Sequence, residues 1–411
     1  MNNILIISNN VISNTNNNGK TILSFFEGRD DFSVAQLYFS GEVPEVEGFK
    51  YYRLSDKDIL SGLFNISNKG SVVEPSITRS IDMNSTLKRK IGKNDITQTA
   101  RDLLWLNKWK SKGLIEWLDS FDPNIIFFVA GDALFPYWIT SFIQKRYNAK
   151  LTIYVTDDYI MPRSNETLLH YFRRNTIKNH LCRSLKNTSH FFTVSEVMKT
   201  TYQGFLGYDS SVILNMTEDL YCPKNINNDK LTLVYAGSFY YGRDKVLFEL
   251  SKILDNYNSL SNDKCAQLEL YSNSKPENNT LKMFESSKSC VFKGSLSRDE
   301  LKDKLNSADI LVFVESFEDK FIEKVKCSLS TKVPEYMSVG KPIITIGPSN
   351  IGSVSYLQDV SFCVDYENLD TISSFLPDIS LQYELGIKAR SKYLNKHNKS
   401  KLQQEFLSYL L

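Results

Sequence analysis

The sequence lacks the residue patterns of a metal-binding or disulfide-bonded protein. Its 411 residues include six cysteines, which form no C-x-x-C pair, and four histidines, none of which has a partner at metal-ligand spacing. We therefore expect reduced cysteines in the core or on the surface, histidines in structural roles and no metal ion. A cytoplasmic location follows from the same cysteine pattern.

Strong net charge and long apolar runs are also missing. The net charge is +2 and charged residues make up 23% of the chain, so nothing points to nucleic acid as a partner. No apolar run approaches the ~20 residues that span a bilayer. The short run 3–8 follows no basic segment, so we expect a strand there and not a signal peptide. The protein is expected to be soluble, or at most peripheral at a membrane.

What the first half does contain is an alternation of apolar runs with helical patterns. An Asn-rich turn ending in Gly19 and Lys20 separates the first strand from a helix through residue 26, as at the start of a Rossmann-like unit. The less regular segment 54–93 is expected to be an insertion or a mobile helix and loop. Strands are predicted at 3–8, 34–39, 125–129, 151–156 and 190–194, and helices at 97–120 and 168–186.

The same alternation restarts after a polar linker, 215–230. We therefore predict an α/β protein with two Rossmann-like domains. The first would span 1–215, completed by a C-terminal helix at 395–411, and the second 216–394. Strands of the second domain are predicted at 231–235, 267–271, 289–292, 310–314, 343–346 and 362–364, and helices at 245–257 and 380–411.

Glu335 is the first candidate binding residue. Ser330 and Thr331 are favourable N-cap residues, so they predict a helix in which Glu335 falls near the positive end of the dipole. A carboxylate there can accept two neighbouring hydroxyls, such as those of a ribose. Lys332 and the backbone donors of the same helix start suit a phosphate. Taken alone, a glutamate such as Glu335 is more often a solvated or capping helix residue.

Further candidates follow predicted strands. Gly237 and Ser238 come directly after one strand and Gly294 after another, where open α/β sheets bind ligands. Arg243 lies shortly beyond, and its guanidinium can bind a diphosphate through two parallel hydrogen bonds. Outside this context, Arg243 would be interpreted as part of a surface ion pair.

Three stretches resemble the carboxy-terminal domain of family 4 glycosyltransferases with the GT-B fold: YAGSFYYGRD, FKGSLSRDELKDKLNSADILVFV and STKVPEYMSVGKPIITIG. ILIISNN, NNGKT and FTVSE resemble the first domain of that family. The resemblance covers nearly the whole chain and is most specific over 231–347. It implies transfer of a sugar from a nucleotide diphosphate sugar, bound in a cleft between two Rossmann-like domains. The acceptor would be a glycan or a lipid-linked molecule of bacterial-type surface polysaccharide synthesis, and no cofactor is implied.

The resemblance also assigns roles by position. Glu335 matches the second glutamate of the family's E-x7-E motif, which binds the donor ribose. Arg243 matches the residue that neutralises the diphosphate. Gly19, with Lys20, matches the glycine loop near the donor phosphates and the acceptor.

The chain departs from the family at two places. Cys327 occupies the position of the first motif glutamate, and the nearest acids, Glu318 and Glu323, are out of register. We expect the long charged loop 315–330 to supply the sugar contacts through its backbone or by closing on binding. The family's lysine shortly after the arginine is also missing, and Lys245 or Lys332 is expected to replace it.

The implied chemistry rests on charge. Arg243, a lysine and helix N-termini can stabilise the departing nucleoside diphosphate without a metal ion. Many members of the family retain the anomeric configuration with no obligate protein nucleophile, and retention is the expectation here. An inverting enzyme would need a base, and Asp157 and Asp158 are the candidates after a first-domain strand. Adjacent acids at a strand end also cap loops and helices.

Two other interpretations stay open. One is a different GT-B activity, a sugar-nucleotide epimerase or a phosphorylase. The other is a catalytically silent homologue that acts as a partner subunit, which Cys327 makes plausible.

Two basic and aromatic stretches, 88–117 and 173–186, are either ordinary core packing with solvated cations or a contact with an anionic membrane surface. Trp105 and Trp109 are predicted to share one helix face. Core packing is the interpretation that we favour.

Overall fold

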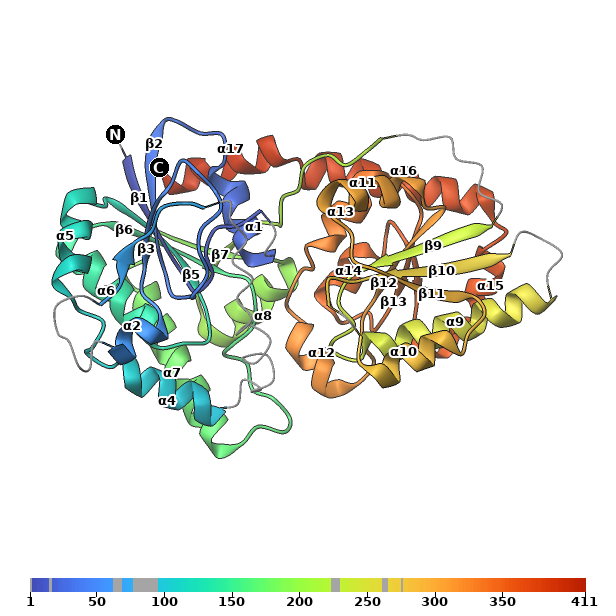
Figure 1. Cartoon of the computed structure of the whole chain (residues 1–411), viewed down its shortest axis with the longest axis horizontal. Helices are drawn as coiled ribbons and strands as arrows, with labels where there is room; N and C mark the ends of the chain where they lie inside the picture. The colour runs from blue at the N-terminus through green and yellow to red at the C-terminus, as the bar shows by residue number, and fades with distance from the viewer. Residues whose placement is uncertain are drawn as a thin grey trace. The chain divides into compact units, whose positions relative to one another are not determined.

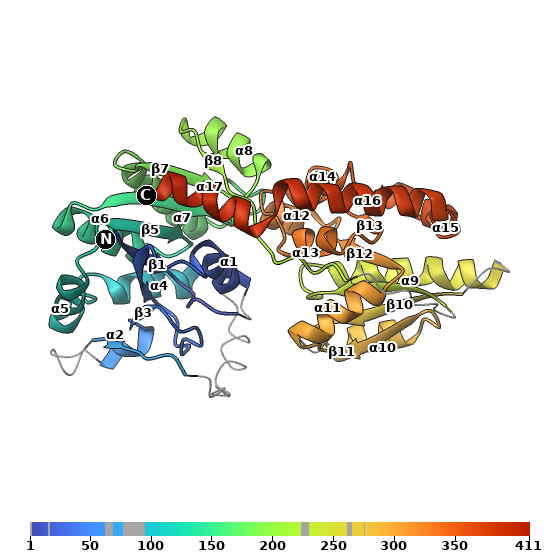
Figure 2. The same ribbon diagram turned by 90° about the horizontal axis from the view of Figure 1, so that it is seen from above.

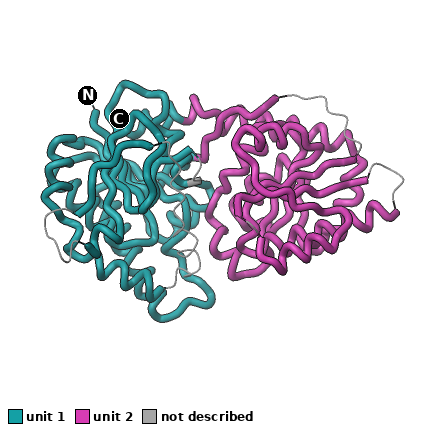
Figure 3. The backbone as a smooth tube through the Cα atoms, in the orientation of Figure 1, with its two compact units in different colours: residues 1–213, 403–411 teal, residues 214–402 magenta. Residues whose placement is uncertain are grey.

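The computed structural model describes residues 2–14, 17–61, 69–76, 95–222, 230–260, 265–274 and 276–411. The chain forms two compact units, one of residues 1–213 and 403–411 and the other of residues 214–402 (Figure 3). The first break lies just before the expected boundary at 215. The chain returns to the first unit at 403, within the C-terminal segment expected from 395.

The first unit contains an eight-stranded sheet in the order β4-β3-β2-β1-β5-β6-β7-β8, parallel except for β4. All five predicted strands are present, with bounds shifted by one or two residues. Three further strands, β3, β4 and β8, are too short to give a clear sequence pattern. The strands are β1 (Asn2–Ser8), β2 (Phe32–Tyr38), β3 (Lys50–Arg53), β4 (Ser71–Val72), β5 (Ile125–Ala130), β6 (Lys150–Val155), β7 (His190–Thr193) and β8 (Ser211–Val212).

The helices of this unit differ from the prediction at one place. The single helix expected at 97–120 is wrong, because it is two helices, α4 and α5. Asn107 has a φ of 56°, and Ser111 begins α5 as an N-cap that accepts a hydrogen bond from the Leu114 amide at 3.2 Å. The helices are α1 (Asn17–Phe26), α2 (Asp56–Ser61), α4 (Asp95–Trp105), α5 (Lys112–Phe121), α6 (Phe135–Tyr147), α7 (Leu168–Leu185), α8 (Glu196–Leu206) and most of α17 (Lys399–Leu410).

The tryptophans of the first basic stretch are core residues. Trp105, Trp109 and Trp117 are each at most 9% exposed, and the Trp105 ring stacks on Phe135 at 3.8 Å. Trp109 lies beyond the end of α4, so the expected shared helix face is wrong. Much of the predicted insertion, including the basic cluster of residues 88–93, lies outside the described residues. Membrane contact gains no support from the buried rings.

The second unit contains a six-stranded parallel sheet in the order β11-β10-β9-β12-β13-β14. Side chains on alternate positions, such as Leu233 and Tyr235, join the core under α9. Figure 1 shows α9 and α10 on one side of the strands and α11, α13 and α16 on the other. All six predicted strands are present: β9 (Leu231–Ala236), β10 (Ala266–Tyr271), β11 (Cys290–Gly294), β12 (Ile310–Val314), β13 (Ile343–Ile346) and β14 (Phe362–Val364).

The helices of the second unit correct two expectations. The segment 315–330, expected to be a loop, contains the short helix α12, and 380–411 is two helices that break after Lys396. The helices are α9 (Arg243–Leu260), α10 (Asn278–Glu285), α11 (Arg298–Ser307), α12 (Asp319–Val325), α13 (Lys332–Val339), α14 (Gly352–Leu357), the 3-10 turn η1 (Tyr366–Thr371), α15 (Ile372–Phe375) and α16 (Ile379–Lys396).

His397 marks the break between α16 and α17. Its side chain is fully buried, with Nδ1 2.8 Å from the Asn215 carbonyl oxygen and Nε2 2.9 Å from the Tyr356 hydroxyl. Burial lowers its pKa to about 4, so the imidazole is neutral at ordinary pH. The histidine therefore joins the start of the second unit to its last residues.

Helix α17 holds the C-terminus to the first unit. Phe406 is fully buried and packs on Phe25 at 4.4 Å and on Phe127 at 5.2 Å. The Gln403 amide donates to the carbonyls of Phe25 and Glu27, at the end of α1, which have no helical donor. Figures 1 and 2 both show α17 beside α1.

Replacement of Phe406 by alanine should therefore destabilise the first unit. Removal of a buried aromatic ring costs about 3–5 kcal/mol, which urea unfolding followed by circular dichroism would measure. The exposed Gln404 of the same helix is the matched control, and Gln404→Ala should be nearly neutral. Equal stability of the two variants would contradict this packing role.

Candidate functional site

The candidate site of the second unit lies where the order of its strands reverses. β9 is the first strand of this unit, and β10 and β12 pair with it on opposite sides. In open α/β sheets, the helices that follow such neighbouring strands lie on opposite faces, and ligands bind in the crevice beyond the carboxyl ends of the strands. The chain leaves β9 into Gly237 and Ser238, and leaves β12 into Glu315 and Ser316.

Arg243 is the first residue of α9 and faces that crevice. Its Nε lies 3.0 Å and its NH2 2.8 Å from the two carboxylate oxygens of Glu315. Its NH1 donates to the Ser238 hydroxyl at 3.2 Å. The side chains of Arg243 and Glu315 are only 12% and 3% exposed. The guanidinium is thus held in one position by a two-point ion pair.

Lys332 is the second cation of the site and comes from the first turn of α13. Its Nζ lies 4.8 Å from the centre of the Tyr235 ring and 3.4 Å from the Tyr235 hydroxyl. Burial lowers its pKa to about 7, and the charge of Arg243 adds to this effect, whereas Glu315 and Glu335 oppose it. An ammonium in this place gains from any anion that enters the crevice.

Gly237 makes room for this lysine. A Cβ atom at Gly237 would lie 1.8 Å from the Lys332 Nζ, so a larger residue would displace the ammonium. Tyr336 of α13 accepts a hydrogen bond from the Ala236 amide at 2.9 Å and so fixes the end of β9. These contacts therefore hold α13 against the turn that follows β9.

The start of α13 differs from the expected N-cap. Thr331 takes the cap position, but its side chain makes no capping hydrogen bond. The Ser330 hydroxyl instead accepts from the Lys332 amide at 3.4 Å. Glu335 lies in the first turn and is partly exposed, and the helix ends at Gly340, whose φ is 73°. Ser330, Lys332 and Glu335 thus share the end of α13 that faces β9.

The other predicted residues of this unit lie elsewhere. Gly294 ends β11, the edge strand, and is separated from β9 by β10. Lys245 is largely exposed and pairs with Glu318 at 2.8 Å, so Lys332 is the lysine beside Arg243. Cys327 is 4% exposed and lies beyond α12.

Glu315 is the site residue that sequence analysis missed. It was counted only as the start of a charged loop. The available signal was an acid directly after the five-residue buried strand β12, at a strand end where few charges are tolerated without a partner.

The candidates of the first unit are spread over two places. Gly19 and Lys20 lie within the first turns of α1, not in the preceding loop, because α1 starts at Asn17. A Cβ atom at Gly19 would lie 2.4 Å from the Val11 carbonyl oxygen, so the glycine allows α1 to approach the loop after β1. A plain packing role explains Gly19, and a ligand role for it stays a prediction.

Asp157 and Asp158 follow β6 but differ in environment. The Asp158 Oδ1 atom accepts from the amides of Ile160 and Met161 at 3.2 Å each and from the Tyr202 hydroxyl at 3.0 Å. Asp158 is 5% exposed and so holds its own loop, which argues against a role as a base. Asp157 is partly exposed, and its role as a base stays a prediction.

Two cations of the second basic stretch form ion pairs within the first unit. Arg173 pairs with Asp102 at 3.1 Å and Arg174 with Glu166 at 2.8 Å, and both arginine side chains are at most 9% exposed. They are therefore unsuited to binding a membrane surface.

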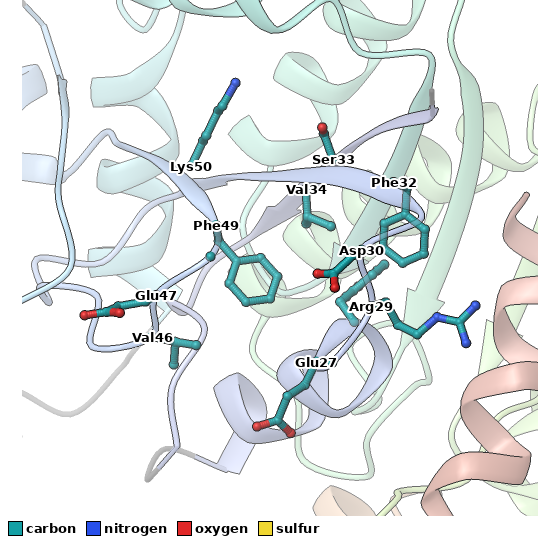
Figure 4. A pocket seen from close by; sticks show the side chains of 13 residues that line it. Glu27, Arg29, Asp30, Phe32, Ser33, Val34, Val46, Glu47, Phe49 and Lys50 are labelled. Atoms are coloured by element: carbon teal, nitrogen blue, oxygen red, sulfur yellow. The ribbon is translucent and has the colours of Figure 1, made fainter.

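A pocket of about 410 Å³ in the first unit is separate from these sites. It lies where β2 and β3 begin, at the opposite end of the sheet from Asp157. Figure 4 shows Phe49 and Val34 inside it, while Glu47 and Lys50 point away from the Phe49 ring. Its position at the amino ends of the strands makes it a poor candidate for the substrate site.

Two classes of feature are missing from the described part of the chain. It contains no cluster of three or more His, Cys, Asp or Glu side chains that could bind a metal ion. Within the same residues, no helix is both long and apolar enough to cross a bilayer.

The fold resembles known structures, although no protein-family model and no curated protein matches the sequence. The chain superimposes over 100% of its length on 99% of TarM, with a TM-score of 0.64 and 11% identity. HepE from Anabaena, solved with UDP and glucose, superimposes with a TM-score of 0.62 and 10% identity, over 100% of this chain and 99% of HepE. A glycosyltransferase from Rickettsia africae superimposes with a TM-score of 0.62 and 12% identity, over 99% of this chain and 97% of that protein.

The chain has the GT-B fold. Its two parallel sheets, each with the strand reversal of a Rossmann-like unit, agree with those of the similar structures over nearly their whole length. At this level of identity, the comparison shows a GT-B architecture alone, and the activity must be argued from the site.

The shifted pKa of Lys332 predicts a pH dependence of stability. In the folded protein the ammonium loses its proton near pH 7, whereas in the unfolded chain it does so near the ordinary value for lysine. The unfolded state therefore binds more protons above pH 7. Wild-type stability relative to Lys332→Met should rise with pH above about 7, by at most ~1.4 kcal/mol per pH unit.

Urea unfolding of both proteins at pH 6, 7, 8 and 9 would measure this difference. A stability difference that stays constant over this range would show that Lys332 keeps an ordinary pKa in the folded state.

Proposed function

We propose that this protein is a family 4 type glycosyltransferase, which transfers a sugar from a nucleotide diphosphate sugar to a glycan or lipid-linked acceptor. The observation that carries the proposal is the pair of cations Arg243 and Lys332 at the strand reversal of the second unit, on either side of the close approach at Gly237. Such a crevice suits a diphosphate, which can meet both cations.

The same helix start also supports binding of the nucleoside part of the donor. Glu335 lies one turn from Lys332, so a diphosphate at Lys332 would place the attached ribose within reach of the Glu335 carboxylate. A carboxylate that accepts both ribose hydroxyls selects ribose over deoxyribose. We expect the donor to be a UDP-sugar or a related nucleotide sugar, as in HepE, which was solved with UDP.

In the reaction, the bond from the anomeric carbon to the diphosphate oxygen breaks and a bond from that carbon to an acceptor hydroxyl oxygen forms. The negative charge that develops on the diphosphate is stabilised by Arg243 and Lys332 without a metal ion. In a retaining reaction, the leaving phosphate oxygen takes the acceptor proton. In an inverting reaction, Asp157 is the remaining candidate base.

The physiological role that we propose is synthesis of a bacterial-type surface polysaccharide in the cytoplasm. The catalytically silent alternative is supported by Cys327, which is buried at the position where the family has a sugar-binding acid. Nucleotide binding without sugar transfer or donor hydrolysis would favour that alternative.

The cation pair predicts the first binding result. Calorimetry with UDP, GDP and ADP should detect binding of at least one nucleotide, and Arg243→Gln and Lys332→Met should each weaken it about 10- to 100-fold, as expected for charge-assisted hydrogen bonds. Arg298, exposed at the start of α11 and paired with Glu218, supplies the control Arg298→Gln, which should bind like wild type. If no nucleotide binds wild type, the proposal fails.

The ribose contact predicts a second result. Wild type should bind the ribonucleoside diphosphate more tightly than its 2′-deoxy analogue, and Glu335→Gln should reduce this preference by about tenfold. Glu285→Gln, at the exposed end of α10, is the matched control. An unchanged preference in Glu335→Gln would remove the ribose role and leave the diphosphate site intact.

A further inference from the structure

The first unit has its own strand reversal, between β1 and β5, and it carries polar groups that the donor site does not use. β1 pairs with both β2 and β5, so its carboxyl end opens on a crevice like that of β9. The chain leaves β1 into Asn9 and leaves β5 into Gly131 and Asp132. A Cβ atom at Gly131 would lie 2.5 Å from the side-chain nitrogen Nδ2 of Asn9, so the Asn9 side chain packs against the end of β5.

Asp132 is the centre of this group. It is partly exposed, and the amide nitrogen of Gln98, from α4, lies 3.5 Å from one of its carboxylate oxygens. Arg173, from α7, donates to the main-chain oxygen of Asp132 and not to its carboxylate. The guanidinium pairs with Asp102 at 3.1 Å. The charge of Arg173 is thus balanced by Asp102, and the hydrogen bond that the Asp132 carboxylate receives from a described residue is the long one from the neutral Gln98 side chain.

Three buried polar atoms around Asp132 have no protein partner among the described residues. They are the Asn9 Oδ1, the Gln98 Oε1 and the Arg173 Nε. Gln98 is 8% exposed and the Arg173 side chain 9%. A flip of the Gln98 amide would set its oxygen against the Asp132 carboxylate, so the observed orientation is the favourable one. Buried polar atoms without partners are costly unless a ligand or water binds them.

The neighbouring strand adds a hydroxyl and a second acid. Tyr159 lies 3.3 Å from an Asp157 carboxylate oxygen. Burial raises the pKa of Tyr159, and the carboxylates of Asp157 and Asp132 raise it further, so its hydroxyl keeps its proton. The crevice therefore presents carboxylates, amide oxygens and fixed N–H and O–H donors. Among the groups described above, the cation Arg173 is paired with Asp102.

We propose that the group formed by Asn9, Gln98, Asp132 and Arg173 binds the hydroxyls of an uncharged sugar and disfavours sugars that carry a phosphate or carboxylate. The amide and carboxylate oxygens accept from the sugar hydroxyls, and the Arg173 Nε donates to a sugar oxygen. The negative charge of Asp132 and Asp157 opposes an anionic ligand. This inference rests on the proposed function, within which the sugar is either the acceptor or the sugar being transferred.

Saturation-transfer NMR on the full chain with saturating UDP would test the proposal. The probes are methyl glycosides of glucose, galactose, mannose and N-acetylglucosamine, with glucuronate and glucose 6-phosphate as charged counterparts. At least one neutral glycoside should bind wild type, and the charged sugars should not bind in its place. Asp132→Asn should weaken neutral-sugar binding about tenfold or more, since it removes a charged acceptor without changing shape.

Two further variants keep the result interpretable. Gln98→Met should also weaken sugar binding, and it serves if Asp132→Asn does not fold. Glu116→Gln, at an exposed position of α5, should bind like wild type. Calorimetry that compares a UDP-sugar with UDP distinguishes the two candidate ligands, the transferred sugar and the acceptor. If Asp132→Asn loses the extra affinity of the UDP-sugar, the transferred sugar occupies the site, and if it loses only the methyl glycoside, the acceptor does.

The proposal is overturned if no neutral glycoside binds wild type and a UDP-sugar binds no more tightly than UDP. It is also overturned if Asp132→Asn and Gln98→Met leave all sugar binding unchanged, or if charged sugars bind as well as neutral ones. Binding of UDP, GDP or ADP by wild type would leave the proposed donor function intact, whereas failure of all three nucleotides to bind would refute that function.

Discussion

The buried ion pair between Arg243 and Glu315 is the constraint on which the candidate site of the second unit depends. It joins the first residue of α9 to the end of β12 across the strand reversal, with both side chains at most 12% exposed. A buried pair of this kind contributes little net stability, because desolvation offsets the attraction, but it fixes geometry. It also holds the guanidinium near Lys332, whose pKa is lowered to about 7 by burial and by the charge of Arg243.

The two units use the same architecture for different chemistry. Each sheet reverses its strand order beside its first strand, and each places polar side chains at the two strand ends that flank the reversal. In the second unit, the cations Arg243 and Lys332 begin helices beside these strand ends, and Gly237 leaves room for Lys332. In the first unit, the side chains present amide and carboxylate oxygens around Asp132. In the proposed function, a diphosphate would bind at the cations of the second unit and an uncharged sugar at the oxygens of the first.

Much of the fold could be predicted, because the strands are continuous apolar runs and parallel buried strands give that pattern directly. α13 was also predicted, since Gly340 is a strong terminator. The predictions failed where a local break has no strong sequence marker. Residues 97–120 look helical throughout, but the positive φ of Asn107 and the cap at Ser111 divide them. The short helix α12, which buries no side chain, likewise gives no amphipathic pattern.

The sequence by itself determined the two Rossmann-like halves, the helix that carries Glu335, and Arg243 and Lys332 as candidate anion ligands, because each depends on local pattern or on a motif. Only the tertiary structure decided which of these meet. It paired Arg243 with Glu315, placed Lys332 under Gly237, separated Gly294 from both and gave Asp158 a loop-holding role. These outcomes depend on which strand ends are neighbours in the sheet, and that order is set by long-range pairing that no local stretch encodes.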